Sequence, residues 1–320
     1  MSTPSARSLV LAGGTGFVGR GLLARLAQAW SGEVRVWARR PAEGLPAAVR
    51  LDQVDLRDQA AVDAALPPGS MVVNLAYARN GRREENLAMA ANLAAACVRR
   101  SAERLVHVST AVVVGLVAQK WVTETTACRP VDEYQRTKLE IEARLASLTG
   151  GRVPLVILRP TAVFGWGGAN LRKLVGDLLC ASRVVNYVRS SLYGRRATHL
   201  VPVETVAAAV EFALSSPQAP GDGLYLVAED EAPENSFREL ERLLLKELGR
   251  HDYRIPPPPL PSWCLEATLR LNRRLVLRPD TRFSSARLRT AGFAPPLALR
   301  EALERYARTA AEQGRSTARP

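Results

Sequence analysis

The chain has 320 residues, of which 47% are apolar and 23% are charged, and this balance excludes a disordered or collagen-like chain. Its formal net charge is +13, carried almost entirely by arginine, and such a field would concentrate anionic ligands such as nucleotide diphosphates. The sequence has no basic helix with interleaved aromatic residues, so nucleic acid is not an expected partner.

Three further patterns bear on membranes, compartment and metals. The longest apolar stretch, residues 105–118, is interrupted by polar residues and is shorter than the roughly 20 residues of a membrane span, so no stable membrane insertion is expected. Residues 1–8 lack the apolar core of a signal peptide, which predicts a cytoplasmic protein. The four cysteines lie far apart without zinc-ligand spacing, so no metal site is predicted.

Short apolar strands alternate with helical stretches over the first half of the chain. The predicted strands cover residues 8–12, 34–38, 49–54, 71–75, 105–109 and 155–158, and the predicted helices cover 17–30, 84–100 and 131–148. This alternation predicts an α/β fold, a Rossmann-like doubly wound parallel sheet.

The pattern changes after Pro160. Further helices are predicted over residues 171–181, 203–214, 237–248, 263–277 and 297–311, with a strand over 221–228; the polar, Arg-containing segment 182–198 is assigned no element. We therefore expect a domain over residues 1–165 and a smaller C-terminal cap over 166–320, mainly for substrate binding. Residues 198–228, roughly, are expected to return to the main sheet.

A glycine-rich turn lies between the first predicted strand and the first predicted helix. The first glycine permits a sharp turn, the second lets backbone approach a pyrophosphate, and the third allows close packing of helix against strand. The helix N-terminus then offers N–H groups to phosphate oxygens. The turn therefore predicts that residues 1–165 bind NAD(P), through Gly13, Thr15, Gly16, Phe17, Val18 and Gly19.

The residues after the second and third strands indicate which dinucleotide is bound. An NAD site usually has an acid at the end of the second strand, but here Ala38 is followed by Arg39 and Arg40. Guanidinium groups suit a 2′-phosphate, so NADP is the predicted cofactor, with NAD as the alternative if the two arginines are solvated surface residues. Asp55, followed by Leu56, is placed to accept a hydrogen bond from the adenine amine.

Tyr134 and Lys138 are four residues apart on a predicted helix and share one of its faces. An ammonium beside a phenol favours the phenolate, so Lys138 is expected to lower the pKa of Tyr134 from about 10 towards neutrality. Tyr134 is thus a candidate general acid and base at an alcohol or carbonyl oxygen. Thr110 follows the fifth strand, at the edge where doubly wound sheets bind ligands, and is placed to hold the substrate oxygen.

Taken together, these motifs resemble the extended short-chain dehydrogenases/reductases, in particular the NAD-dependent epimerase/dehydratase family, from about residue 9 to 228. The resemblance also rests on Asn74-Leu75-Ala76, on Asn86, and on the segment 158–165, which is similar to the family's LRPxxVYG. It implies Thr110, Tyr134 and Lys138 as the catalytic residues, with Lys138 also at the cofactor ribose. It further implies that the cofactor contacts Leu75, Ala76, Pro160 and Val163.

The resemblance implies an oxidoreductase that acts on a hydroxyl or keto group of a small molecule, foremost a nucleotide-linked sugar. Asn170 and Arg195 are candidate substrate ligands, because their segments suit a diphosphate. One alternative is an NADPH-dependent reductase of an apolar ketone or aldehyde, flavonoid-like or steroid-like, roofed by the apolar helix 263–277. A second alternative is an NADP-binding sensor without turnover. The candidate assembly is a homodimer.

Overall fold

The centre of the molecule is a parallel sheet of seven strands, in a computed structural model that describes residues 8–215, 223–271 and 280–316. Every neighbouring pair in this sheet is parallel, which confirms the predicted doubly wound α/β fold. In spatial order the strands are β10 (Gly223–Val227), β7 (Leu155–Pro160), β5 (Arg104–Val108), β4 (Met71–Asn74), β1 (Leu9–Ala12), β2 (Val34–Ala38) and β3 (Val49–Gln53).

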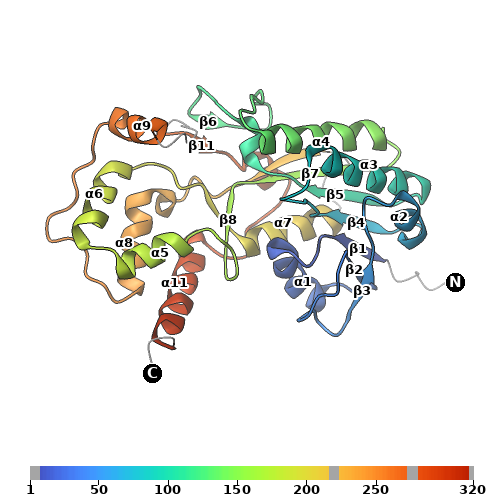
Figure 1. The fold of residues 1–320 in the computed structure, drawn as a ribbon, viewed down its shortest axis with the longest axis horizontal. Helices are drawn as coiled ribbons and strands as arrows, with labels where there is room; N and C mark the ends of the chain where they lie inside the picture. The colour runs from blue at the N-terminus through green and yellow to red at the C-terminus, as the bar shows by residue number, and fades with distance from the viewer. Residues whose placement is uncertain (1–7, 216–222, 272–279, 317–320) are drawn as a thin grey trace.

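The strands are apolar on both faces because helices cover the sheet on both sides. In β1, Leu9 and Leu11 belong to one apolar core, and Val10 and Ala12 belong to the other. Helices α1 and α7 contribute to the first core, and α2, α3 and α4 to the second (Figure 1). Their bounds are α1 (Phe17–Ala29), α7 (Val203–Ser215), α2 (Gln59–Ala65), α3 (Arg83–Arg99) and α4 (Glu133–Thr149).

Much of the second half of the chain forms a helical cap beside the sheet, at the left of Figure 1. The third apolar core lies between the cap helices α5, α8 and α11. The remaining elements are α5 (Arg172–Cys180), α6 (Arg183–Tyr193), α8 (Phe237–Glu247), α9 (Ser262–Leu271), α10 (Ala286–Thr290), α11 (Leu299–Ser316), η1 (Ala111–Val114) and η2 (Pro233–Asn235). The predicted helix 263–277 thus corresponds to α9, and its last six residues lie outside the described residues.

Two short parallel ladders lie between distant segments. β8 (Ala162–Phe164) pairs with β9 (Leu200–Pro202), and β6 (Trp121–Val122) pairs with β11 (Arg282–Phe283). Of the segment 198–228, β10 joins the main sheet beside β7, and α7 packs on its face, whereas β9 lies outside that sheet. No helix among the described residues has the length and apolar composition that crossing a bilayer requires.

Helix α6 corrects the sequence analysis, which assigned no element to residues 182–198. Its inward positions are polar, with Asn186, Ser190 and Ser191 buried, whereas Val184 is 72% exposed. The apolar side chains therefore lie on the outer face, and the usual pattern of apolar residues facing a core is inverted. Ser182 begins the helix by accepting a hydrogen bond from the Val185 N–H at 3.3 Å.

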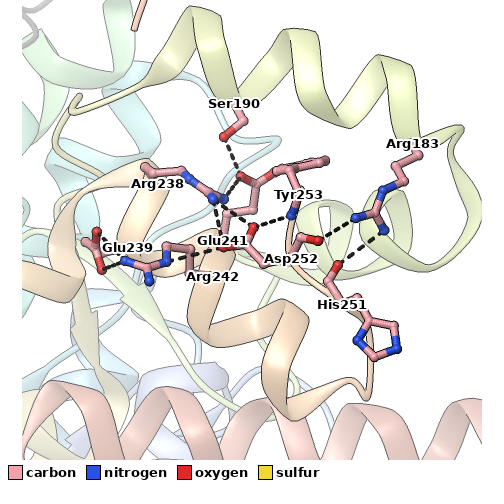
Figure 2. A network of polar contacts seen from close by, with 9 residues as sticks. All are labelled: Arg183, Ser190, Arg238, Glu239, Glu241, Arg242, His251, Asp252 and Tyr253. Atoms are coloured by element: carbon pink, nitrogen blue, oxygen red, sulfur yellow. Dashed lines mark hydrogen bonds and ion pairs between the residues drawn. The ribbon is translucent and has the colours of Figure 1, made fainter. Parts of the chain in front are cut away.

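A polar network explains how this inverted face is buried. Figure 2 shows the carboxylate of Glu241, a fully buried residue of α8, which accepts hydrogen bonds from Ser190 of α6 at 2.5 Å, Arg238 at 2.9 Å and Tyr253 at 3.0 Å. Asp252 pairs with Arg238 at 2.7 Å. Because each buried charge has partners, these hydrogen bonds hold α6 on α8 beside a stacked aromatic contact between the two helices.

We expect Gly19→Ala to lower the free energy of unfolding by about 1–3 kcal/mol. A Cβ at Gly19 would lie 2.3 Å from the carbonyl oxygen of Gly14, so α1 would have to move away from the turn before it. Gly176→Ala in α5 is the matched control, because its Cβ would meet nothing within 4 Å, and it should stabilise by about 0.5–1 kcal/mol. Urea denaturation measures both changes, and equal effects at the two positions would contradict this prediction.

Candidate functional site

A cavity of about 990 Å³ opens at the carboxyl ends of the strands and extends to segments of the cap. It brings together most of the residues that the sequence analysis singled out. Those that line it are Gly13, Gly16, Phe17, Val18, Gly19, Leu75, Thr110, Tyr134, Lys138, Pro160, Val163 and Asn170. The predicted residues that do not line it are Thr15, Arg39, Arg40, Asp55, Leu56, Ala76 and Arg195.

The glycine-rich turn has the geometry of a phosphate cradle. Gly13 has a φ of +80°, and a Cβ there would lie 2.8 Å from the backbone nitrogen of Ala76, so the position favours glycine. No side chain caps the N-terminus of α1, which begins after Gly16. The first N–H groups of α1 are thus open to an anion, and the turn fits the pyrophosphate of a dinucleotide.

The four residues predicted for the adenosine end do not line the cavity, and they differ in their contacts. Arg39 and Arg40 are exposed at the end of β2. Asp55 is held by Arg57 at 2.6 Å, and this hydrogen bond lowers the pKa of the carboxyl group. Leu56 is buried in an apolar core. A contact between Asp55 and adenine stays a prediction, and it would share a carboxylate that already binds a guanidinium.

The loop after β4 carries cavity residues that the sequence analysis did not find. Buried Asn86 holds this loop, because its side chain accepts from the Ala78 N–H at 2.8 Å and donates to the Ala78 carbonyl at 3.1 Å. The loop thereby presents Tyr77 and Arg79 to the cavity. Arg79 is exposed, its guanidinium forms no ion pair with any described residue, and its charge lowers the pKa of Tyr134.

Tyr134 lies in the first turn of α4, which begins where Asp132 accepts a hydrogen bond from the Gln135 N–H at 2.8 Å. Its ring is 41% exposed and packs edge-on against Tyr77, with the centroids 5.3 Å apart. Burial raises the pKa of the phenol, and a hydrogen bond with Thr110 opposes that rise. The Thr110 hydroxyl and the Tyr134 phenol therefore lie together at one end of the cavity.

Lys138 is buried one turn further along α4. Its ammonium lies 4.9 Å from the centroid of the Tyr77 ring and donates to the Val108 carbonyl at 3.5 Å. Burial lowers the pKa of Lys138 to about 8. The expectation that Lys138 lowers the pKa of Tyr134 is wrong, because the pKa of Tyr134 is raised and the groups that lower it are Thr110 and Arg79.

A buried ion pair supports this face of α4. Arg159 at the end of β7 binds Glu142 at 2.5 Å, and both side chains are almost fully buried. Ser109, the residue before Thr110, donates its hydroxyl proton to the same carboxylate. Neighbouring His107 is fully buried, and burial together with the charge of Lys138 keeps its pKa well below the usual range. The Ser109 hydroxyl is thus engaged, whereas that of Thr110 faces Tyr134.

The cap side of the cavity is built from three segments. Asn170 donates to the Val163 carbonyl at 2.7 Å, which fixes it beside the segment that follows β7. His199 and Phe283 also line the cavity, and neither was found from the sequence because no motif marks them. Arg195, in contrast, is exposed and lines a separate cavity of about 620 Å³ with Trp121.

Comparison with known proteins identifies the family. A profile described as the NAD dependent epimerase/dehydratase family matches residues 9–227, more than half of the chain. The chain belongs to this family. It is therefore an NAD(P)-dependent enzyme of the extended short-chain dehydrogenase/reductase type, as the motifs predicted.

A curated relative from Danio rerio supports this assignment. It is the short-chain dehydrogenase/reductase family 42E member 1, and it is 27% identical over 207 residues. The match covers 58% of this chain and 51% of the relative, so the chain spans about half the length of that protein.

Solved structures of similar fold cover almost the whole chain. A candidate epimerase from Burkholderia cenocepacia is 25% identical with a TM-score of 0.74, and the match covers 97% of this chain and all of that one. WbmG from Bordetella bronchiseptica, in complex with NAD, is 18% identical with a TM-score of 0.74 and coverages of 98% and 96%. The UDP-glucose 4-epimerase of Thermus thermophilus, also with NAD, is 23% identical with a TM-score of 0.68 and coverages of 96% and 99%.

We expect Lys138→Met to stabilise the enzyme at pH 7 by about 1–3 kcal/mol, because it removes an ammonium whose burial shifts its pKa from 10.5 to about 8. Above pH 8 the folded wild-type enzyme loses a proton that the unfolded chain keeps until about pH 10.5. The wild-type stability should therefore rise across this window, and the variant should lack that rise.

Urea denaturation at pH 7 and pH 9.5 measures both effects. Lys246→Met is the matched control, because Lys246 is exposed on α8 and its loss should change stability by less than about 0.5 kcal/mol at either pH. A Lys138→Met variant that is less stable than wild type at pH 7 would contradict the prediction.

Proposed function

We propose that this enzyme oxidises and reduces a hydroxyl or keto group of a nucleotide-linked sugar, with Tyr134 as the general acid and base. The observation that carries the proposal is the meeting of Thr110, Tyr134 and Lys138 in one cavity with the uncapped N-terminus of α1. A dinucleotide on the glycine-rich turn and a substrate at Tyr134 would thus occupy the same cavity.

Each catalytic residue has a distinct task in this proposal. The Tyr134 phenol gives its proton to the substrate oxygen during reduction and takes it back during oxidation. The Thr110 hydroxyl holds the same oxygen, and buried Lys138 holds the cofactor ribose. The nicotinamide, when bound, supplies or accepts the hydride. A phenol with a pKa at or above its ordinary value of about 10 carries its proton at neutral pH, so Tyr134 can act as the acid in reduction.

The charge and size of the cavity support a nucleotide-linked substrate. Arg79 lines the cavity without an ion-pair partner among the described residues, so it is available to a diphosphate. A cavity of about 990 Å³ has room for a large polar ligand beside a dinucleotide. WbmG has been solved with NAD and UDP, and other structures of this fold are UDP-sugar epimerases and a dTDP-glucose 4,6-dehydratase.

The apolar-ketone alternative relies on α9 as a roof, and the placement of α9 does not favour it. Leu265 of α9 lines the separate cavity of about 620 Å³, and Trp263 is largely exposed. No described residue of α9 lines the cavity that contains Tyr134. A polar substrate therefore has the better support.

We expect Tyr134→Phe to slow turnover of a nucleotide sugar about 10²–10⁴-fold and to leave the dissociation constant for NADPH nearly unchanged. The reason is that the phenol lies at the substrate end, away from the glycine-rich turn. Steady-state rates on a panel of UDP- and dTDP-sugars, with cofactor binding followed by fluorescence, measure both quantities. Tyr187→Phe, which changes a tyrosine of the cap helix α6, is the control and should keep the wild-type rate. A Tyr134→Phe variant that keeps more than about a tenth of the wild-type rate would refute the role of Tyr134 as the general acid and base.

The cofactor in this proposal is NADP, with the 2′-phosphate at Arg39 and Arg40. Both arginines are exposed at the end of β2, and no acid occupies that position. We expect removal of both to weaken NADPH binding about 10- to 100-fold and to leave NADH binding almost unchanged, since a charge-assisted hydrogen bond contributes about 1.5–3 kcal/mol. Adding Ala38→Asp should then favour NADH, because a carboxylate repels the phosphate and accepts from ribose hydroxyls.

The control for this cofactor experiment must remove the same charge elsewhere. Arg144 and Arg152 are exposed on α4 and on the loop before β7, away from the carboxyl edge of the sheet. Their double replacement by alanine should leave both dissociation constants within about twofold at fixed ionic strength. Equal losses for NADPH and NADH in the Arg39/Arg40 variant would assign the two arginines to the general field, and NAD would be the better cofactor.

A further inference from the structure

A histidine on the cap side of the cavity has the setting of a functional residue. His199 comes directly before β9 and lines the same cavity as Tyr134, Thr110 and Asn170. Its side chain is 15% exposed, and its ring packs edge-on against Phe283 with the centroids 5.1 Å apart. The ring is therefore held between the cap and the space where a substrate would bind.

The hydrogen bonds around Asp230 determine which nitrogen of His199 carries the proton. The Asp230 side chain is fully buried, and its Oδ2 lies 2.6 Å from Nδ1 of His199. The carboxylate already accepts from the Phe283 N–H at 2.8 Å and from the Asn235 side chain at 3.2 Å. A carboxylate with these two donors acts as an acceptor, so Nδ1 of His199 carries a proton, and in the neutral ring Nε2 presents a lone pair.

The backbone at His199 is held in an unusual conformation. Its φ is +55°, in the left-handed region that few residues other than glycine adopt. Buried Asn235 fixes both neighbours, because its Oδ1 accepts from the Leu200 N–H at 2.7 Å and from the Thr198 hydroxyl at 2.7 Å. The His199 carbonyl accepts from the Ala162 N–H at 2.8 Å. Strain that so many contacts maintain is a feature of functional sites.

We infer that His199, oriented by Asp230, is a substrate-recognition residue whose Nε2 accepts a hydrogen bond from a hydroxyl group of the sugar. His199 is one of the residues that line the cavity, its Nδ1 is held by Asp230, and its Nε2 has no hydrogen-bond partner among the described residues. This inference rests on the proposed function and makes it more specific, since the substrate must carry a hydroxyl group at the end that faces the cap. An apolar ketone would leave Nε2 without a partner, which disfavours such substrates.

The test compares ligands with and without the sugar. Calorimetry on the NADP-loaded full chain, in a Tyr134→Phe background that prevents turnover, gives dissociation constants for UDP, UDP-glucose, UDP-N-acetylglucosamine and dTDP-glucose. We expect His199→Phe, which keeps the aromatic packing and removes both nitrogens, to weaken the best-bound sugar about 10-fold and to leave UDP within about twofold. His199→Gln should recover most of the loss, because its amide oxygen can accept the same hydrogen bond.

His251→Phe is the matched control. His251 is exposed on the cap, and only its backbone carbonyl takes part in the network of Figure 2, so the sugar affinity should not change. Two outcomes would overturn the inference without touching the proposed function. One is equal sugar affinity in His199→Phe and wild type. The other is a panel in which no nucleotide sugar binds more tightly than its nucleotide without the sugar. A sugar affinity that depends on His199, in an enzyme whose turnover does not need Tyr134, would overturn the proposed function alone.

A second measurement observes the His199 ring in the wild-type protein. The chain has three histidines, so nitrogen-15 spectra of histidine-labelled protein can be assigned by comparison with the His199→Phe and His251→Phe variants. We expect the His199 ring as the tautomer with its proton on Nδ1, and we expect its Nε2 resonance to move when the sugar nucleotide, but not UDP, is added. A proton on Nε2, or a resonance that the bound sugar leaves unchanged, would overturn the inference.

Discussion

The parallel direction of all seven strands is the constraint on which the site depends. Parallel strands end at the same edge, so the residues after β1, β4, β5 and β7 must meet there, although they are far apart in the sequence. The glycine-rich turn, the loop with Tyr77, Thr110 and the segment after Pro160 are these residues. Catalytic geometry therefore follows from the sheet register, and the apolar cores on both faces maintain that register.

The burial of charged side chains is the second determinant of the site, and these side chains lie on one face of α4. Glu142 neutralises Arg159 and accepts a hydrogen bond from Ser109, whereas Lys138, one turn away, has a long hydrogen bond to a carbonyl and an aromatic ring beneath its ammonium. Burial lowers the pKa of this lysine, and the charge of Glu142 opposes that shift in part. An anionic ligand near Lys138 would favour its charged form further.

Sequence patterns predicted the carboxyl edge of the sheet well because the motifs that mark it are local in the sequence. Apolar runs marked the strands, and turns and spacings marked Gly13, Thr110, Tyr134 and Lys138, which line one cavity. The patterns did not predict α6, whose buried face is polar, nor the raised pKa of Tyr134, which is caused by burial. They also did not predict the pair of His199 and Asp230, because the two residues are 31 positions apart in the sequence and no motif records such a contact.

Main-chain hydrogen bonds join the two walls of the cavity. β8 follows the main sheet directly and pairs with β9, and the Ala162 N–H bonds to the carbonyl of His199. A change of side chain does not remove these hydrogen bonds between the cap wall and the sheet wall. Side chains on the cap wall, such as His199, can therefore vary without displacing Tyr134 or Thr110. If acid–base chemistry belongs to the sheet wall and recognition to the cap wall, as we propose, one sheet edge can serve different substrates through changes confined to the cap.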